Sequence, residues 1–193
     1  MGTHGEPEYL LPREAVHTVV LCEPDPRWAE SYAGEEVRIR AAVGDALVEV
    51  QHVGSTSVPG LSAKPIIDIL LTVADSTDEG SYAPGLEGVG YLFHVREPHW
   101  HEHRLFKRGT PHFGPHPAGA QDLKVNLHVF TAGSSEAQRM VVFRDWLRTH
   151  PDDRVLYERT KRDLARRRWP HVQDYADAKS AVVTDIMRRA LDE

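Results

Sequence analysis

The chain has 193 residues, of which 40 % are hydrophobic and 27 % are charged, and this composition is typical of a soluble globular protein rather than a disordered or fibrous one. Its formal net charge of −6 argues against a dedicated nucleic-acid binder, and its single cysteine, Cys22, excludes an intrachain disulfide and a thiolate zinc site. The first residues are polar and no apolar run reaches the roughly 18 residues that span a bilayer, so we expect a cytoplasmic protein without a membrane segment.

The length predicts a single domain over residues 1–193, with a flexible leader at 1–13 and a mixed-sheet core at 18–131. Asp25-Pro26 predicts the start of a helix, because an acid can cap its first turn and proline favours that turn, and Gly44 predicts its end. Apolar runs predict strands over 47–53 and 66–73, and then over 91–95, 103–107 and 125–130. A loop rich in proline and glycine separates the last two strands, and residues 75–90 are polar with a short helix.

From Ser134 onward the pattern changes to helices, and residues 134–193 are predicted to form a C-terminal helical segment. His150-Pro151 ends the first helix, a second runs from about residue 152 to 168, and a third ends near residue 191. The apolar spacings that define these helices are Met140, Phe143 and Leu147; Leu156, Thr160 and Leu164; and Val172, Tyr175, Val182 and Ile186. The predicted fold class is therefore α+β, a mixed β-sheet flanked by helices.

The most informative stretch runs from His52 to Leu71. Gly54 and Ser55 close one predicted strand, and Asp68 lies inside the next. Glycine lets the backbone approach an anion, the hydroxyls of Ser55 and Thr56 add donors, and a carboxylate can hold the cation that neutralises the anion. An unpaired acid within this apolar strand would cost several kcal/mol if it were buried. The stretch therefore predicts a phosphate site beside a metal site.

With these residues in view, the sequence resembles the GrpB family, also known as UPF0157, which is placed in the nucleotidyltransferase superfamily of the DNA polymerase beta type. The likeness covers nearly the whole chain. It is carried by Glu23-Pro-Asp-Pro-Arg-Trp28, by residues 52–68, by Asn126-Leu-His-Val129, by Phe143-Arg-Asp-Trp-Leu-Arg148 with His150-Pro151, and by the spaced Tyr157, Lys161, Tyr175 and Lys179.

The resemblance implies a mixed sheet of nucleotidyltransferase type and a magnesium-dependent transfer of a nucleoside monophosphate, in which Gly54 and Ser55 grip the triphosphate. The superfamily's paired acids, separated by one residue, are represented here by Asp68 alone. Ile66 and Leu70 occupy the flanking positions on the same face. A third acid on a neighbouring strand would fall near Asn126 or His128, and neither residue is an acid.

Other polar residues complete the predicted site. His128 is a candidate metal ligand, because a neutral imidazole binds metal ions and its strand should lie beside that of Asp68. Lys64 either neutralises phosphate or pairs with Asp68. The candidates are Asp68 and Ser55 for catalysis, Asp68 and His128 for the metal, and Gly54, Ser55, Thr56, Lys64, Arg104, Asn126, Lys161, Tyr175 and Lys179 for the substrate.

A second polar cluster covers His101 to Arg104. On a strand, His101 and His103 would face one way while Glu102 and Arg104 face the other. We interpret Arg104 as a phosphate contact. The two histidines could bind zinc, although twelve histidines in the chain make chance clusters common.

Three functions stay open at this point. The first is a magnesium-dependent nucleotidyltransferase, whose partners are a nucleoside triphosphate and a small-molecule acceptor rather than a membrane or a nucleic acid. The second is a module on the same scaffold that lost most catalysis with its second acid and kept a nucleotide- or phosphate-binding pocket. The third is a zinc-dependent hydrolase that uses His101 and His103.

Overall fold

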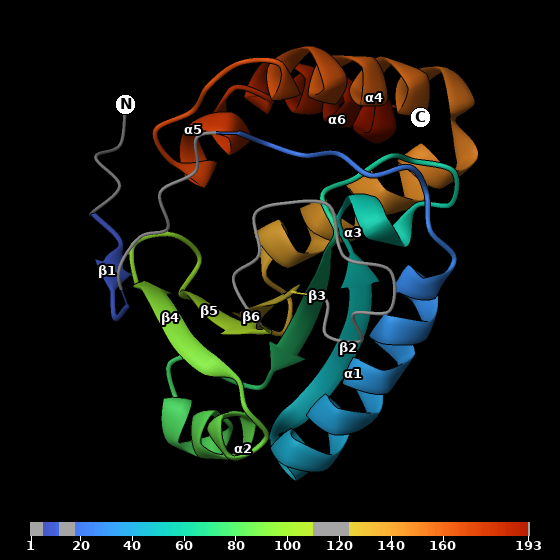
Figure 1. Ribbon diagram of the computed structural model, residues 1–193. Helices are drawn as coiled ribbons and strands as arrows, with labels where there is room; N and C mark the ends of the chain where they lie inside the picture. The colour runs from blue at the N-terminus through green and yellow to red at the C-terminus, as the bar shows by residue number, and fades with distance from the viewer. Residues whose placement is uncertain (1–5, 12–17, 110–123, 193) are drawn as a thin grey trace.

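The computed structural model describes residues 6–11, 18–109 and 124–192. These residues form a six-stranded mixed sheet, in the order β1-β4-β5-β6-β3-β2, with helices on both faces (Figure 1). The predicted α+β class is confirmed. The elements are β1 (Glu8–Tyr9), α1 (Arg27–Val43), η1 (Gly44–Ala46), β2 (Leu47–Val53), η2 (Ser55–Ser57), β3 (Ile66–Val73), η3 (Glu79–Ser81), α2 (Ala83–Gly88), β4 (Leu92–Glu97), β5 (His103–Arg108), β6 (Lys124–Thr131), α3 (Ser135–Thr149), α4 (Pro151–Ala165), α5 (Val172–Asp177) and α6 (Ser180–Asp192).

Strand β3 is the centre of the fold. It pairs in parallel with β6 and antiparallel with β2, and the register places Asp68 between Val53 and Asn126. Because side chains alternate across a strand, Ile67, Ile69, Leu71 and Val73 all point to one face. There they form the main core with α1 and α2, through residues such as Trp28, Ile39, Val43 and Leu86. Asp68 and Leu70 point to the opposite face.

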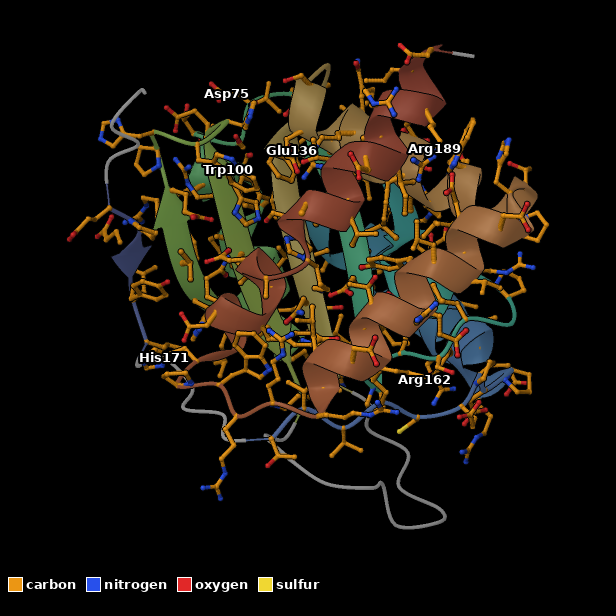
Figure 2. All side chains as sticks on the ribbon, turned by 90° about the horizontal axis from the view of Figure 1, so that it is seen from above. Asp75, Trp100, Glu136, Arg162, His171 and Arg189 are labelled. Atoms are coloured by element: carbon orange, nitrogen blue, oxygen red, sulfur yellow. The ribbon has the colours of Figure 1, made fainter. Side chains whose placement is uncertain are left out.

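That opposite face is covered unevenly. Leu70, Val53 and Phe130 pack against Ala137 and Met140 of α3, which closes one part of the face. Helices α4, α5 and α6 lie over the rest, and Figure 2 looks down through them onto the strands. They pack mainly on α3 and on the segments before α1 and after η2, in clusters that contain Leu61, Leu147, Tyr157 and Ile186 and, separately, Val19, Leu164 and Tyr175. Space for a ligand is therefore left between these helices and the polar part of the sheet.

The N-terminal prediction needs correction. Glu8 and Tyr9, expected within a flexible leader over 1–13, form an edge strand that pairs with β4. Glu8 also makes an ion pair with Arg96, at 2.8 Å. Backbone pairing and this charge contact hold a segment whose composition gives no strand signal. Residues 1–5 and 12–13, together with the predicted proline- and glycine-rich loop within 110–123, lie outside the described residues.

The C-terminal helices also differ from the prediction. In α4 the buried residues are Tyr157, Lys161 and Leu164, whereas Leu156 is 42 % exposed. The third predicted helix is broken into α5 and α6 around Lys179. Alanine and lysine favour helices, so local propensity gives no signal for this break, and tertiary packing decides it. Among the described residues, no helix is long and apolar enough to cross a membrane.

Candidate functional site

A pocket of about 520 Å³ lies between the polar part of the sheet and the C-terminal helices. This volume is within the usual range for small-molecule and cofactor sites. Every residue predicted for the site except Arg104 lines it: Gly54, Ser55, Thr56, Lys64, Asp68, Asn126, His128, Lys161, Tyr175 and Lys179. Segments more than 100 residues apart in the sequence thus meet in one place, as the contact between Lys161 and Ser55 illustrates.

The turn after β2 brings the backbone against Asp68. Gly54 has φ +68° and ψ −172°, a conformation that is essentially restricted to glycine. A Cβ atom at this position would overlap Asp68 Oδ2 and lie 2.9 Å from Asp68 Cβ. The absence of a side chain is therefore what allows the Gly54–Ser55 turn and the carboxylate to share one site.

The hydroxyl groups of this turn have different partners. Thr56 Oγ1 donates to the carbonyl of Ile66 and is hydrogen-bonded to His52 Nε2, each at 3.0 Å. The Thr56 side chain therefore fixes the turn to β3. The Ser55 hydroxyl instead faces the pocket, where Lys161 Nζ donates to it at 3.1 Å.

Asp68 is the carboxylate at the centre of the pocket. Asn126 Nδ2 donates to its Oδ1 at 2.9 Å, and His128 Nε2 lies 3.9 Å from the same oxygen. Burial would raise the pKa of Asp68, but the neighbouring His128 and Asn126 outweigh burial, and the pKa is held below its usual value. Asp68 is therefore ionised at neutral pH and available to a cation.

Three lysines surround this carboxylate. Lys161 is only 2 % exposed and donates to Ser55 Oγ and to the carbonyl of Ser62. The ammonium groups of Lys64 and Lys179 lie over the ring of Tyr175, at 5.5 and 4.8 Å from its centroid. No ion pair joins Lys64 to Asp68 within the described part of the chain, but the charge of Lys64 helps to lower the pKa of Asp68, so both roles considered for Lys64 stay open.

Burial disfavours the charged form of these three lysine side chains. Burial, followed by the charge of Lys179, lowers the pKa of Lys161 to about 7 and that of Lys64 to about 8. Burial also lowers the pKa of Lys179 itself. In addition, the buried Tyr175 hydroxyl has no hydrogen-bond partner among the described residues. Clustered ammonium groups and an unsatisfied buried hydroxyl suit a polyanionic ligand, which would stabilise the former and satisfy the latter.

The sequence profile described as GrpB protein matches residues 18–189. The chain belongs to the GrpB family. A UPF0157 protein of Halalkalibacterium halodurans is 54 % identical over 181 residues, which make up 94 % of this chain and 86 % of that protein. The crystal structure of a conserved GrpB protein from Enterococcus faecalis matches with a TM-score of 0.67 and 26 % identity, over 90 % of this chain and 98 % of that one. Sequence and fold thus agree on the family.

A further relative differs in length. A protein of Mycolicibacterium paratuberculosis named dephospho-CoA kinase is 31 % identical over 188 residues, which cover 90 % of this chain but 46 % of that protein. A GrpB-like segment therefore makes up about half of a longer chain in that organism.

The donor set in the GrpB pocket suits one divalent cation better than two. Within residues 6–11, 18–109 and 124–192, no group of three or more His, Cys, Asp or Glu side chains converges as metal ligands. Asp68 and His128 provide two donors, and Mg²⁺ commonly uses one or two carboxylates and completes its shell with water and substrate phosphates. Ile66 and Leu70 hold the positions beside Asp68 on the same face, so a second carboxylate is absent from that strand.

The two histidines proposed as a zinc pair do not face a common point. His101 and Glu102 have φ of 54° and 50°, and β5 begins only at His103, so the strand alternation assumed for this cluster is wrong. His101 is exposed, whereas His103 is buried and hydrogen-bonded to Glu97 and His128. The structure gives no support to a zinc hydrolase site at His101 and His103.

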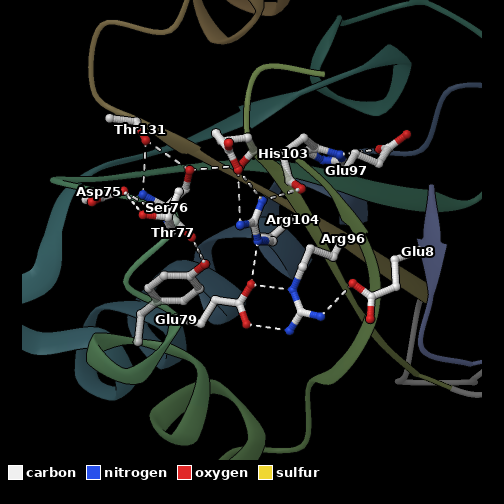
Figure 3. A network of polar contacts seen from close by, with 12 residues as sticks. Glu8, Asp75, Ser76, Thr77, Glu79, Arg96, Glu97, His103, Arg104 and Thr131 are labelled. Atoms are coloured by element: carbon white, nitrogen blue, oxygen red, sulfur yellow. Dashed lines mark hydrogen bonds and ion pairs between the residues drawn. The ribbon is translucent and has the colours of Figure 1, made fainter. Parts of the chain in front are cut away.

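Arg104, predicted as a phosphate contact, is placed away from the pocket. It lies on the other face of β5 and is 4 % exposed. Glu79 accepts hydrogen bonds from Arg104 Nε at 2.6 Å and from Arg96 at 2.7 and 2.6 Å (Figure 3). Arg104 also contacts Glu102, and Arg96 contacts Glu8. This charge network joins β1, β4 and β5 to η3, so its role is structural.

We expect Arg104→Met to lower the free energy of unfolding by about 3 kcal/mol. Removing one partner of a buried charge network leaves the remaining buried charges only partly neutralised. Urea unfolding measures this loss. Arg188→Met, which removes an exposed pair with Asp192, should change stability little. If the variant instead kept wild-type stability but bound its ligand more weakly, Arg104 would have to be assigned to the functional site.

The pocket also contains residues that the sequence did not point to. Lys107 and Lys124 line it, and their charges help to lower the pKa of Lys64. Lys107 lies opposite Asn126 in the β5–β6 register. Only knowledge of this register, which single strands do not reveal, would have placed Lys107 beside the site.

Proposed function

We propose that this protein binds the triphosphate of a nucleotide in the pocket between Gly54 and Asp68, and that it transfers a nucleoside monophosphate to a small acceptor. One observation carries the proposal: Lys64, Lys161 and Lys179 converge on the same space as Ser55 and Asp68. Several cations around a single carboxylate favour a ligand with several negative charges. The resemblance to the nucleotidyltransferase superfamily supports a nucleoside triphosphate as that ligand.

Each group has a specific task in this proposal. The backbone and hydroxyl of Ser55 bind phosphate oxygens, and the lysines neutralise the charge that the triphosphate carries. Asp68 and His128 would hold a divalent cation, for which magnesium is the expectation from the resemblance. Such an ion supplies charge neutralisation at the transferred phosphate and at the departing pyrophosphate. Asn126 donates to Asp68 and so orients the carboxylate.

The relative named dephospho-CoA kinase adds support. Dephospho-CoA is itself a nucleotide derivative, and about half of that longer protein resembles the present chain. The present chain contains no Gly-x-x-x-x-Gly-Lys-Ser/Thr phosphate loop. In this proposal the phosphates are therefore bound by other groups, those of the pocket described above.

Calorimetry with each of the four common nucleoside triphosphates, with and without Mg²⁺, tests the binding step, and a pyrophosphate assay with candidate acceptors tests turnover. We expect saturable binding of at least one nucleotide, weakened about 10-fold or more in Lys179→Met through loss of a charged contact. Arg166→Met, which changes an exposed arginine of the region after α4, is the matched control and should bind normally. Absence of binding to all four nucleotides would refute the proposal.

A second candidate function is a nucleotide-binding module without turnover. It is favoured by the absence of the superfamily's other acids: Ile66 and Leu70 flank Asp68 on the same face, and the place of the third acid falls near Asn126 or His128. The same two assays separate the candidates, because binding without pyrophosphate release under any condition would identify the module.

Nucleotide affinity should fall as the pH rises from 6 to 9. Lys161, with a pKa of about 7, and Lys64, with a pKa of about 8, lose their protons in this range and with them their attraction for phosphate. We expect a weakening of about 10-fold or more. The native state also binds fewer protons than the unfolded chain here, so the free energy of unfolding should rise with pH.

Lys161→Met serves as the reference for this pH dependence. Titration of the nucleotide itself affects both proteins equally, so the difference between their pH profiles reports Lys161. The step near pH 7 should disappear in the variant, and the step near pH 8 should remain. Identical profiles for the two proteins would contradict the assignment.

A further inference from the structure

Four polar side chains form a row across four neighbouring strands on the pocket face of the sheet. Glu97 Oε2 of β4 lies 2.7 Å from His103 Nδ1 of β5, and this contact is visible in Figure 3. His103 Nε2 lies 3.1 Å from His128 Nδ1 of β6. His128 Nε2 then lies 3.9 Å from Asp68 Oδ1 of β3. Glu97, at one end of the row, is partly exposed and lines the same pocket as His128 and Asp68, whereas His103 is buried between them.

The hydrogen-bond partners fix where the protons lie in this row. An ionised carboxylate only accepts, so His103 Nδ1 carries the proton that is donated to Glu97. The His103 ring is 3 % exposed and stacks against Phe130 and His128, and such burial disfavours a second proton. His103 Nε2 therefore accepts, and His128 Nδ1 must be the donor. Without a metal ion, His128 faces Asp68 through Nε2 and lowers the pKa of that carboxyl by hydrogen bonding and charge. A metal ion would take the place of the proton on Nε2, whose lone pair lies on the side of Asp68.

The two terminal atoms are close enough to share a metal ion after a small movement. Neighbouring donors that bind one ion at about 2.1 Å each lie about 3.0–3.4 Å apart in an octahedral or tetrahedral shell. The separation of 3.9 Å between His128 Nε2 and Asp68 Oδ1 is wider than this, so metal binding would draw the two side chains together by about 0.5 Å or more. An imidazole nitrogen is a better ligand for transition-metal ions than for Mg²⁺, which prefers oxygen.

We propose that Glu97 and His103 are positioning residues that hold His128 as a metal ligand, and that the cation at Asp68 is a transition-metal ion, with Mn²⁺ bound in preference to Mg²⁺. The inference rests on the metal site of the proposed function and specifies its chemistry. A metal-binding histidine typically donates its other ring N–H to a neighbouring acceptor, which fixes the orientation of the ring. His103 is that acceptor here, and Glu97 in turn fixes His103.

The test measures Mn²⁺ binding to the full chain without nucleotide, by electron paramagnetic resonance. Pulsed spectra of the bound ion should show coupling to a directly bound nitrogen, and this coupling should be absent in His128→Ala. We expect Mn²⁺ affinity to fall about 10- to 100-fold in both His128→Ala and Glu97→Gln. In Glu97→Gln the new amide can donate a hydrogen bond to His103 Nδ1. That nitrogen then no longer has to carry the proton, so the donor and acceptor roles of His103 and His128 are no longer fixed.

Competition with Mg²⁺ measures selectivity. The preference for Mn²⁺ over Mg²⁺ should shrink about 10-fold in His128→Ala, because the nitrogen ligand is gone while Asp68 remains. Glu87→Gln, which makes the same change on an exposed position of α2, should keep the wild-type affinity and selectivity. Circular dichroism confirms that each variant is folded, and the nitrogen coupling of the wild-type protein requires no variant.

Bound Mn²⁺ without nitrogen coupling in the wild-type protein would overturn the inference, and so would a selectivity unchanged by His128→Ala. Nucleotide binding in the presence of a chelator reports the proposed function separately. A protein that binds nucleotide but gives no nitrogen coupling would keep the proposed function and lose this inference. A protein that gives nitrogen-coupled Mn²⁺ but has no nucleotide affinity would keep this inference and lose the proposed function.

Discussion

Asp68→Asn is expected to lower the rate of pyrophosphate release at least about 100-fold, because the variant lacks the carboxylate that would hold the cation at the reacting phosphate. The stimulation of nucleotide binding by a divalent cation should disappear at the same time. Nucleotide binding in the presence of a chelator should be equal to or tighter than that of the wild type, since the substitution removes the negative charge that faces the triphosphate among Lys64, Lys161 and Lys179.

Loss of the metal-dependent effects without loss of metal-free nucleotide binding makes the prediction specific. A variant that was merely damaged would lose both kinds of binding. Asp45→Asn, at an exposed position of η1, is the matched control and should behave as the wild type. If Asp68→Asn left turnover and metal affinity unchanged, the metal assignment would be wrong.

Gly54→Ala is expected to abolish nucleotide binding and to destabilise the protein. The backbone conformation at Gly54 costs about 1–3 kcal/mol for any other residue. The added Cβ would also overlap the Asp68 carboxylate, so either the turn or Asp68 must move. Calorimetry and urea unfolding measure the two effects.

Gly60 provides a control in the same connection. Its φ is +77°, yet a Cβ atom added to this residue would meet no other atom within 4 Å. Gly60→Ala should therefore cost only backbone strain, about 1 kcal/mol, and should keep nucleotide affinity. Equal effects of the two substitutions on binding would show that contact between the turn and Asp68 is unimportant.

Local sequence signals are enough to predict the central part of the site. The apolar runs at β2 and β3 and the small residues between them predict both strands with the bounds that the structure shows. Gly54, Ser55 and Asp68 can be placed together because they belong to adjacent elements. The family motif then adds Lys161, Tyr175 and Lys179, which no local pattern connects to β3.

The errors arise where placement depends on pairing between distant strands or on tertiary packing. The phosphate assignment of Arg104 fails because a single sequence predicts the strand over 103–107 but does not reveal which of its two faces lies toward the pocket. The row from Glu97 to Asp68 depends on the registers of β4, β5, β6 and β3, which single strands do not encode. In α4 the apolar spacing points to Leu156, but the helix turns Tyr157 and the cationic Lys161 inward, toward the ligand pocket.

The most direct test of the central claim is a crystal structure of the full chain soaked with a nonhydrolysable nucleoside triphosphate and Mn²⁺. The account predicts density for the triphosphate between the Gly54–Ser55 turn and the ammonium groups of Lys161 and Lys179, with the ion bound by Asp68 and His128. An empty pocket at saturating nucleotide, or a nucleotide bound at another surface, would contradict it.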